Sequence, residues 1–156
     1  MIKEKDDNAL LGVYVKPETL FVKGEGSWLI DDTGKRYLDF GAGIAVNQLG
    51  HNFEPITRAI AEQSQKLIHL SNLYVNETQV ELAELLLEAC PAFDKVFFCN
   101  SGTEANEALL KFARHYWVEQ GFEERIKVIS FNMSFHGRTL GALSLTGQKG
   151  LRDGFG

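Results

Sequence analysis

Ser101, Gly102 and Thr103 combine two hydroxyl groups and a glycine at the point where an apolar run gives way to a helical pattern. The first N–H groups of a helix have no partner within the helix, and the helix dipole makes this end attractive to anions. Glycine lets the backbone approach a ligand closely, and the hydroxyls add donors. These residues therefore indicate a phosphate site. The alternative is an ordinary helix N-cap, which the strand–loop–helix pattern taken alone favours.

A second polar stretch places Phe135 beside His136, Gly137 and Arg138. Phe135 would offer a face on which an aromatic ring can stack, a contact worth about 1 kcal/mol beyond its buried area. Arg138 would offer a planar fork of donors for a carboxylate. Together they suit a flat, anionic ligand. The residues alone favour two more ordinary roles, a core phenylalanine and a surface arginine in a salt bridge.

Other kinds of site find little support in the sequence. Ser101 does not stand in a G-x-S-x-G nucleophile elbow, and no nucleotide-binding loop of the G-x-x-x-x-G-K-[ST] type occurs. Residues 41–46 begin like a dinucleotide fingerprint, but Val46 takes the place of the third glycine, which predicts a close-packed glycine turn instead. The histidines are too scattered for a metal site, and we expect each to be structural: His51, His69, His115 and His136.

Both polar stretches follow segments that we predict to be buried strands. Residues 95–99 and 127–131 are short apolar runs, and the helix between them carries an apolar stripe and ends near Trp117. Strand, helix and strand over about 35 residues fit a right-handed parallel βαβ unit. The carboxyl ends of parallel strands share one edge of a sheet, so we expect Gly102, Phe135 and Arg138 to lie within reach of one small ligand.

The first half of the chain is predicted to contain a small antiparallel meander and two helices. The strands are expected at residues 21–23, 28–30 and 36–40, with glycine-containing turns between them. Proline at position 55 begins one predicted helix, which runs to about Leu67. Asn76 and Gln79 have the spacing of a capping pair for the other, which runs to about Glu88.

Two other segments of this half have no regular pattern. Residues 68–74 are uncharged and irregular, and we expect them to be buried or to line a cavity. Residues 1–10 are polar and charged, and we expect a frayed terminus.

The composition is that of an ordinary soluble protein, with 44% hydrophobic residues, 24% charged residues and a net charge of −5. The acidic balance argues against nucleic-acid binding, and no apolar run approaches the ~20 residues of a membrane span. The first residues are too polar for a signal peptide. Cys90 and Cys99 lack the spacing of metal ligands and suggest buried thiols in a reducing compartment. We therefore expect a cytoplasmic protein without nucleic-acid or membrane partners.

The stretch Asn-Ser-Gly-Thr-Glu-Ala-Asn at residues 100–106 closely resembles the phosphate-binding turn of class III pyridoxal-phosphate aminotransferases, in particular the acetylornithine aminotransferase group. The resemblance extends from about Tyr14 to Gly156. Ordered matches are far more specific than any single one, and seven stretches follow the family's order: residues 21–26, 37–40, 43–47, 49–51, 71–74, 100–106 and 135–139.

The resemblance implies an α/β fold with two domains. Residues 1–68 would form a β meander and a helix that belong to a small domain. Residues 69–156 would form the first part of a fold-type I pyridoxal-phosphate transferase large domain, whose sheet is mainly parallel.

The resemblance also implies roles for individual residues. Residues 101–103 (Ser101, Gly102 and Thr103) would hold the phosphate of pyridoxal 5'-phosphate, and Phe135 would stack on its pyridine ring. Arg138 would take a substrate carboxylate, and Tyr14 resembles a substrate-side tyrosine of the related ornithine aminotransferases.

The implied activity is transfer of the ω-amino group of N-acetylornithine, or a related ω-amino acid, to 2-oxoglutarate in arginine biosynthesis, by a homodimer. The family's cofactor-binding lysine, and the aspartate that pairs with the pyridine nitrogen, lie well beyond residue 156. We therefore expect the N-terminal part of a transaminase, with no catalytic residue of its own and no activity by itself. Two alternatives stay open: a non-catalytic binding or assembly fragment, and a nucleotide-binding α/β domain that uses residues 101–103 for another phosphate.

Overall fold

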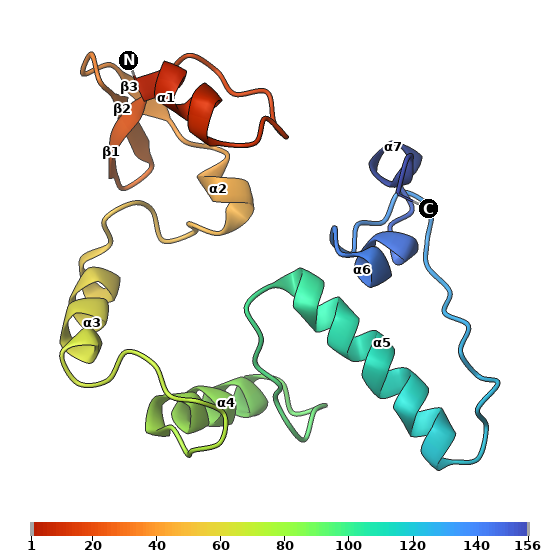
Figure 1. Ribbon diagram of the computed structural model, residues 1–156. Coiled ribbons are helices and arrows are strands. Elements are labelled where there is room, and N and C mark those ends of the chain that lie inside the picture. The colour runs from red at the N-terminus through yellow and green to blue at the C-terminus, as the bar shows by residue number, and fades with distance from the viewer. Residues whose placement is uncertain (1, 156) are drawn as a thin grey trace. The chain divides into compact units, whose positions relative to one another are not determined.

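The computed structural model describes residues 2–155, which form two compact units, Met1–Val75 and Asn76–Gly156 (Figure 1). The first unit contains, in chain order, α1 (Ile2–Ala9), β1 (Phe21–Glu25), β2 (Trp28–Asp31), β3 (Arg36–Leu38), α2 (Ala42–Ala45) and α3 (Glu54–Ser64). The second unit contains α4 (Glu77–Ala89), α5 (Gly102–Glu119), α6 (Leu140–Leu145) and α7 (Lys149–Arg152). The domain division after residue 68 stays a prediction.

The strands β1, β2 and β3 form one antiparallel sheet in chain order, which confirms the predicted meander. Glu25 pairs with Trp28 across the first turn, and Leu29 of β2 pairs with Tyr37 of β3. Asp31, at the end of β2, is only 6% exposed, and its carboxylate accepts four hydrogen bonds from the turn that follows and from Tyr37.

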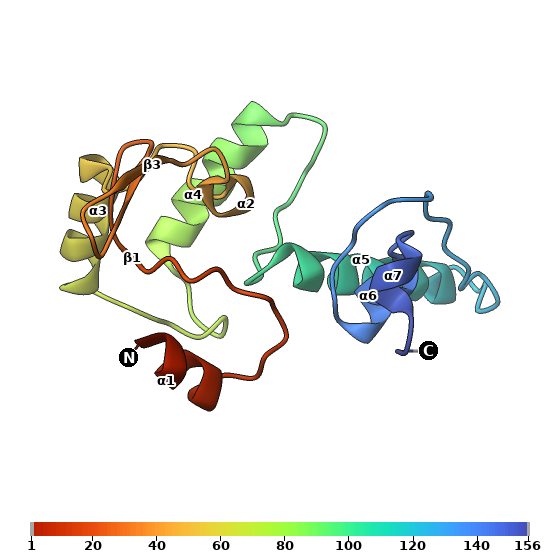
Figure 2. The same ribbon diagram turned by 90° about the horizontal axis from the view of Figure 1, so that it is seen from above.

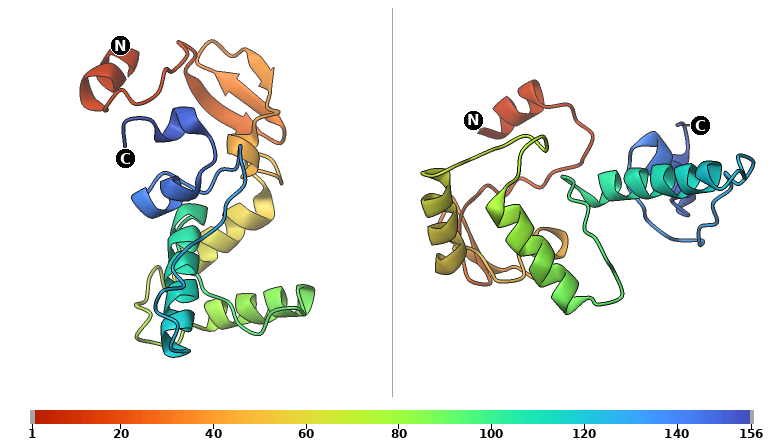
Figure 3. Two further views of the ribbon diagram at one scale, coloured as in Figure 1. Left: turned by 90° about the vertical axis from the view of Figure 1, so that its right-hand side faces the viewer. Right: turned by 90° about the horizontal axis from the view of Figure 1, so that it is seen from below.

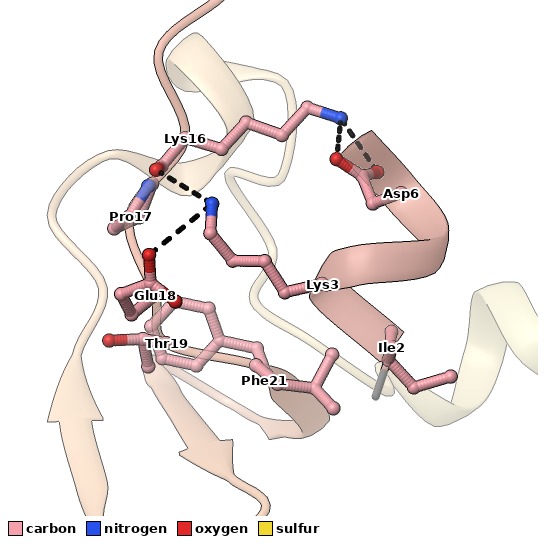
Figure 4. A pocket seen from close by; sticks show the side chains of 9 residues that line it. Ile2, Lys3, Asp6, Lys16, Pro17, Glu18, Thr19 and Phe21 are labelled. Atoms are coloured by element: carbon pink, nitrogen blue, oxygen red, sulfur yellow. Dashed lines mark hydrogen bonds and ion pairs between the residues drawn. The ribbon is translucent and has the colours of Figure 1, made fainter. Parts of the chain in front are cut away.

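The charged N-terminal segment forms helix α1, so the prediction of a frayed end is wrong for the described residues. Lys16 Nζ lies 2.7 Å from both carboxylate oxygens of Asp6, and Lys3 Nζ lies 3.6 Å from Glu18 Oε1 (Figure 4). These ion pairs connect α1 to the segment before β1, around a cavity of about 320 Å³. Ion pairs across a loop leave no periodic signal in a sequence, which is why the charge pattern alone suggested fraying.

The segment labelled α2 is a turn of left-handed backbone, whose four residues have φ between 43° and 64°. Only glycine adopts this region without strain. The Asp39 carboxylate supports the turn, because Oδ1 accepts from the N–H groups of Gly41 (3.0 Å) and Ala42 (2.8 Å), while Oδ2 lies 2.8 Å from His51 Nε2. The predicted turn is present, but residues 43–46 are exposed rather than close-packed.

The two helices predicted in the middle of the chain are confirmed as α3 and α4. A proline lies in the first turn of α3. Asn76 is the N-cap of α4, and its side chain accepts a hydrogen bond from the N–H of Gln79 at 3.4 Å. The sequence predicts that residues 68–74 are buried or line a cavity. Burial is contradicted, since Ile68 is 85% and Leu73 87% exposed, while Ile68 does line an open hollow along α3. A lack of charge makes burial less costly, but it does not supply a partner to pack against.

In the second unit α6 packs against α5 (Figure 2). Among the described residues, the buried apolar side chains are those of Leu110 in α5 and of Ala142 and Leu143 in α6, and Thr146, which follows α6, is fully buried. After α5 the chain returns as an extended segment toward α6 and α7 (Figure 3). The loop that precedes α6 is thereby brought to the first turns of α5.

Residues 95–99 and 127–131 form no strand among the described residues, so the predicted parallel βαβ unit is not formed there. Their side chains are not buried either, since Phe97 is 59% and Phe131 83% exposed. A strand needs a neighbouring strand to complete its hydrogen bonds, and residues 2–155 place none beside either segment. The α/β class is confirmed, but the sheet present here is the antiparallel meander.

Cys90 and Cys99 are both exposed, so the predicted burial of their thiols is wrong. Cys90 directly follows α4, and Cys99 lies in one of the two unpaired apolar segments. Within residues 2–155, no helix is long and apolar enough to cross a membrane. The same residues contain no group of three side chains that could hold a metal ion.

Candidate functional site

The site is built on the first turn of α5. Ser101 is the N-cap, and its Oγ accepts a hydrogen bond from the N–H of Glu104 at 3.2 Å. The Glu104 carboxylate reaches back and accepts from the N–H of Asn100 at 2.6 Å. This reciprocal arrangement fixes where the helix begins, so the cap that the sequence offered as an alternative is real. A hydroxyl that accepts one hydrogen bond can still donate another, so capping leaves Ser101 able to contact an anion.

Gly102 and Thr103 contribute first-turn N–H groups, which have no acceptor within an α-helix. A Cβ added at Gly102 would meet no atom within 4 Å, so packing does not require a glycine here. Gly102 is the first residue of α5, at the end of the helix that carries these unpaired N–H groups. A ligand can therefore approach the backbone at this position.

Thr103 is in contact with the loop of residues 135–139. A Cβ added at Gly137 would lie 2.8 Å from Thr103 Cβ and Cγ2, and Gly137 has a φ of 132°, so only glycine fits. Asn106 Nδ2 donates to the carbonyl of His136 at 2.7 Å and to the carbonyl of Gly102 at 3.0 Å. One side chain thus connects the first turn of α5 with the loop.

Glu107 holds the other end of this loop. Its carboxylate accepts hydrogen bonds from the hydroxyl of Thr139 and, at 3.1 Å, from the N–H of Ala142 in α6. The hydrogen bond from the Thr139 hydroxyl is the main reason why the pKa of Glu107 lies below its ordinary value, and the hydrogen bond from the N–H of Ala142 lowers this pKa further. The residue is half-buried and carries a negative charge at neutral pH.

Thr146 fixes the loop from the side of α6. Its buried Oγ1 accepts from the N–H of His136 at 3.0 Å. The N–H of Gly147 donates a hydrogen bond to the carbonyl of Ser134 at 3.0 Å. The loop backbone is therefore held at several points, while Phe135 remains 56% exposed and Arg138 is exposed. Fixed backbone with outward side chains is what a ligand-binding loop requires.

The structure brings several of the predicted site residues together within the second unit. Ser101, Gly102 and Thr103 begin α5, and the loop that carries Phe135 and Arg138 lies against Thr103. The ligand contacts predicted for these residues stay predictions. What the structure places together is the first turn of α5 and the backbone of the loop that carries Phe135 and Arg138.

Tyr14 belongs to the first unit, where it is 60% exposed and lines a small cavity of about 70 Å³ with Asp6 and Leu10. Its predicted role beside the substrate stays a prediction.

Sequence reasoning missed the three residues that hold the loop: Asn106, Glu107 and Thr146. A signal for two of them was present, because Asn106 and Glu107 lie one turn before the buried Leu110 on the same helix. Polar side chains next to the apolar stripe of a helix often meet a neighbouring segment. The identity of that segment could not be read from the pattern.

Comparisons with known proteins agree on one family. The sequence profile of the family described as "Aminotransferase class-III" matches residues 13–156. The chain is 47% identical over 151 residues to the probable mitochondrial acetylornithine aminotransferase of Dictyostelium discoideum, covering 96% of this chain and 33% of that protein. It is 50% identical over 146 residues to the acetylornithine aminotransferase of Aquifex aeolicus (strain VF5), covering 94% of this chain and 39% of that protein.

Solved structures are similar over almost the whole chain. The ω-transaminase from Pseudomonas jessenii in complex with PMP matches with a TM-score of 0.92 and 33% identity, covering 99% of this chain and 36% of that one. An (S)-enantioselective ω-transaminase from Thermomicrobium roseum matches with a TM-score of 0.92 and 34% identity, covering 99% and 37%. The chain thus spans between a third and two fifths of the relatives it matches. The predicted transaminase fold is confirmed.

Proposed function

Because the chain belongs to the class III aminotransferase family, we propose that it is the N-terminal part of a pyridoxal-phosphate-dependent aminotransferase. The reaction proposed for the whole protein is transfer of the ω-amino group of N-acetylornithine, or a related ω-amino acid, to 2-oxoglutarate. The names of the relatives support this substrate class. The observation that carries the proposal is the contact between the start of α5 and the loop of residues 135–139.

The residues at this contact fit pyridoxal phosphate. The open position at Gly102 leaves room for a phosphate at the unpaired N–H groups of the helix. Phe135 is exposed enough to stack on a pyridine ring, and Arg138 can pair with a carboxylate through two parallel hydrogen bonds. When bound, the cofactor would act as the electron sink for amino-group transfer. This chain's residues would hold and orient it.

The pathway, location and assembly of the whole protein are also proposed. The proposed setting of the whole protein is arginine biosynthesis, which the relatives' names as acetylornithine aminotransferases support. A cytoplasmic location and a homodimer are part of the same proposal. Tyr14 would contribute to the substrate side of the site. A non-catalytic binding or assembly role is the alternative, and the exposed apolar segments around Phe97 and Phe131 favour it.

A substitution at Gly102 tests the phosphate site. Gly102→Ala adds a methyl group that meets no protein atom and points toward the N-terminal end of the helix, as every helical Cβ does. We expect pyridoxal phosphate to bind about tenfold more weakly, a loss of roughly 1.4 kcal/mol, while the helix stays folded. Binding to the purified chain is measured by fluorescence titration.

Gly150→Ala is the matched control, because a Cβ at Gly150 in α7 also meets no atom within 4 Å. It should bind the cofactor as the wild type does. Equal affinity for the wild type and Gly102→Ala would remove the phosphate site from the first turn of α5.

A further inference from the structure

We propose that Glu107 is a positioning residue, which keeps the loop of residues 135–139 at the N-terminus of α5 so that the phosphate donors and Phe135 act on one ligand. This inference rests on the proposed function, because it concerns the same site. Glu107 itself would not contact the ligand. It would act through Thr139 and the start of α6.

The contacts of Glu107 join two elements that are far apart in the sequence. Its carboxylate accepts from the Thr139 hydroxyl, 32 positions away, and from the Ala142 N–H, 35 positions away. Thr139 is the N-cap of α6, and no side-chain hydrogen bond of its own caps that helix. The first N–H groups of α6 therefore depend on an acceptor from another element, and Glu107 of α5 is that acceptor.

Gly141 makes this approach possible. A Cβ at Gly141 would lie 2.7 Å from Glu107 Oε1 and 2.8 Å from Glu107 Cδ, closer than real side chains tolerate. The absence of a side chain at Gly141 thus leaves the space that the Glu107 carboxylate occupies. A carboxylate at the N-terminus of a helix is also favoured by the helix dipole.

Glu107 holds the loop next to a residue of the proposed site. Arg138 directly precedes Thr139, so the hydrogen bond from Thr139 to Glu107 fixes the backbone next to the guanidinium. Asn106, the preceding residue of α5, holds the carbonyl of His136 in the same loop. Two adjacent side chains of α5 therefore hold both flanks of Gly137, the residue that contacts Thr103.

Two probes separate positioning from general stability. Inorganic phosphate requires only the first turn of α5, whereas pyridoxal phosphate also uses Phe135 on the loop. In Glu107→Gln we expect about tenfold weaker binding of pyridoxal phosphate, because a charge-assisted hydrogen bond is lost. Binding of inorganic phosphate, followed by the NMR shifts of the Gly102 and Thr103 amides, should stay within about twofold of wild type because the first turn is unchanged.

Three further variants sharpen the test. Glu119→Gln removes a carboxylate from the last turn of the same helix, where it lies 3.8 Å from His115 Nε2, and should change neither affinity. Thr139→Val should reproduce the loss seen in Glu107→Gln. Thr139→Ser keeps the hydroxyl and should retain wild-type affinity. An equal loss for both probes in Glu107→Gln would overturn positioning, because damage to α5 would then be the cause.

Hydrogen exchange tests the inference independently of cofactor binding. In the ligand-free chain, the Ala142 amide should exchange about tenfold faster in Glu107→Gln than in wild type. Its exchange rate in Glu119→Gln should equal that of wild type. If the wild-type chain binds neither probe, the proposed function fails, and the exchange at Ala142 still shows whether Glu107 holds the start of α6. An unchanged exchange rate at Ala142 in Glu107→Gln would overturn the positioning role of Glu107.

Discussion

Asp31 remains charged although it is almost completely buried, because its carboxylate is surrounded by donors. Oδ1 accepts from the N–H and hydroxyl of Thr33 at 2.9 and 2.7 Å and from the N–H of Lys35 at 2.9 Å. Oδ2 accepts from the hydroxyl of Tyr37 at 2.9 Å. These hydrogen bonds, led by the Thr33 hydroxyl, lower the pKa of Asp31 from 3.8 to about 2.

This lowered pKa predicts a dependence of stability on pH. The folded state binds the proton of Asp31 less tightly than the unfolded state, so the stabilisation is complete above pH 3.8 and is lost as the pH falls toward 2. We expect the NMR shifts of the Thr33 and Lys35 amides to titrate with a midpoint near 2. In Tyr37→Phe the midpoint should rise, because one donor is removed.

Asp32→Asn is the control for this titration, since Asp32 is exposed and next to Asp31. The amides should titrate as in wild type. A midpoint of 3.8 in the wild-type chain would show that the four hydrogen bonds do not favour the charged form.

At the scale of elements, the left-handed turn at α2 is the clearest departure from ordinary backbone. Ile44 has a φ of 64° and is 95% exposed, so its side chain gains nothing from packing. A β-branched residue in this region is strained by roughly 1–2 kcal/mol. Three of the four residues in the turn are not glycine, and the Asp39 carboxylate compensates with its two hydrogen bonds to the backbone.

Ile44→Gly should therefore stabilise the first unit, against the usual effect of glycine. The strain relieved exceeds the extra freedom of glycine in the unfolded chain, and we expect a gain of roughly 0.5–1 kcal/mol in the free energy of unfolding. The free energy of unfolding is measured by chemical denaturation, with the fluorescence of Trp28 in β2 as the signal.

Val46→Gly is the matched control, because Val46 is also exposed, at 84%, but has a φ of −78°. Glycine there relieves no strain and should destabilise the unit by about 0.5–1 kcal/mol. A loss of stability in Ile44→Gly equal to that in Val46→Gly would contradict the strained turn.

At the scale of the whole molecule, the chain carries a ligand-binding arrangement but a small apolar core. Leu110, Ala142 and Leu143 are its buried apolar residues within the described part, whereas many large apolar side chains are exposed. Such surface favours association with other protein. The two relatives are about 2.9 and about 2.4 times as long as this chain, because the matched 151 and 146 residues make up 33% and 39% of them.

We expect the purified 156-residue chain to bind pyridoxal phosphate weakly and to form no glutamate from N-acetylornithine and 2-oxoglutarate. No motif places any of its lysines, such as Lys111 or Lys127, for covalent catalysis. The assay follows glutamate over time and uses free pyridoxal phosphate as the reference. Sustained turnover above that reference, lost in Arg138→Ala, would reveal an active site within these residues.

The sequence by itself determined the local elements and the family. The cap of α4 and the start of α5 at Ser101 depend on residues within four positions of each other. The strands of the meander pair residues at most ten positions apart, across short turns. Such local contacts leave a pattern that can be read. The motif at residues 100–106 and its companions likewise indicated a class III aminotransferase.

Only the tertiary structure decided what surrounds these elements. The contact of Gly137 with Thr103 and the hydrogen bond of Thr139 to Glu107 join residues more than 30 positions apart, and no local periodicity encodes them. The same holds for residues 95–99, whose apolar character predicted a buried strand. An apolar sequence shows that a segment can be buried. Whether a neighbouring strand is there to bury it depends on the tertiary fold.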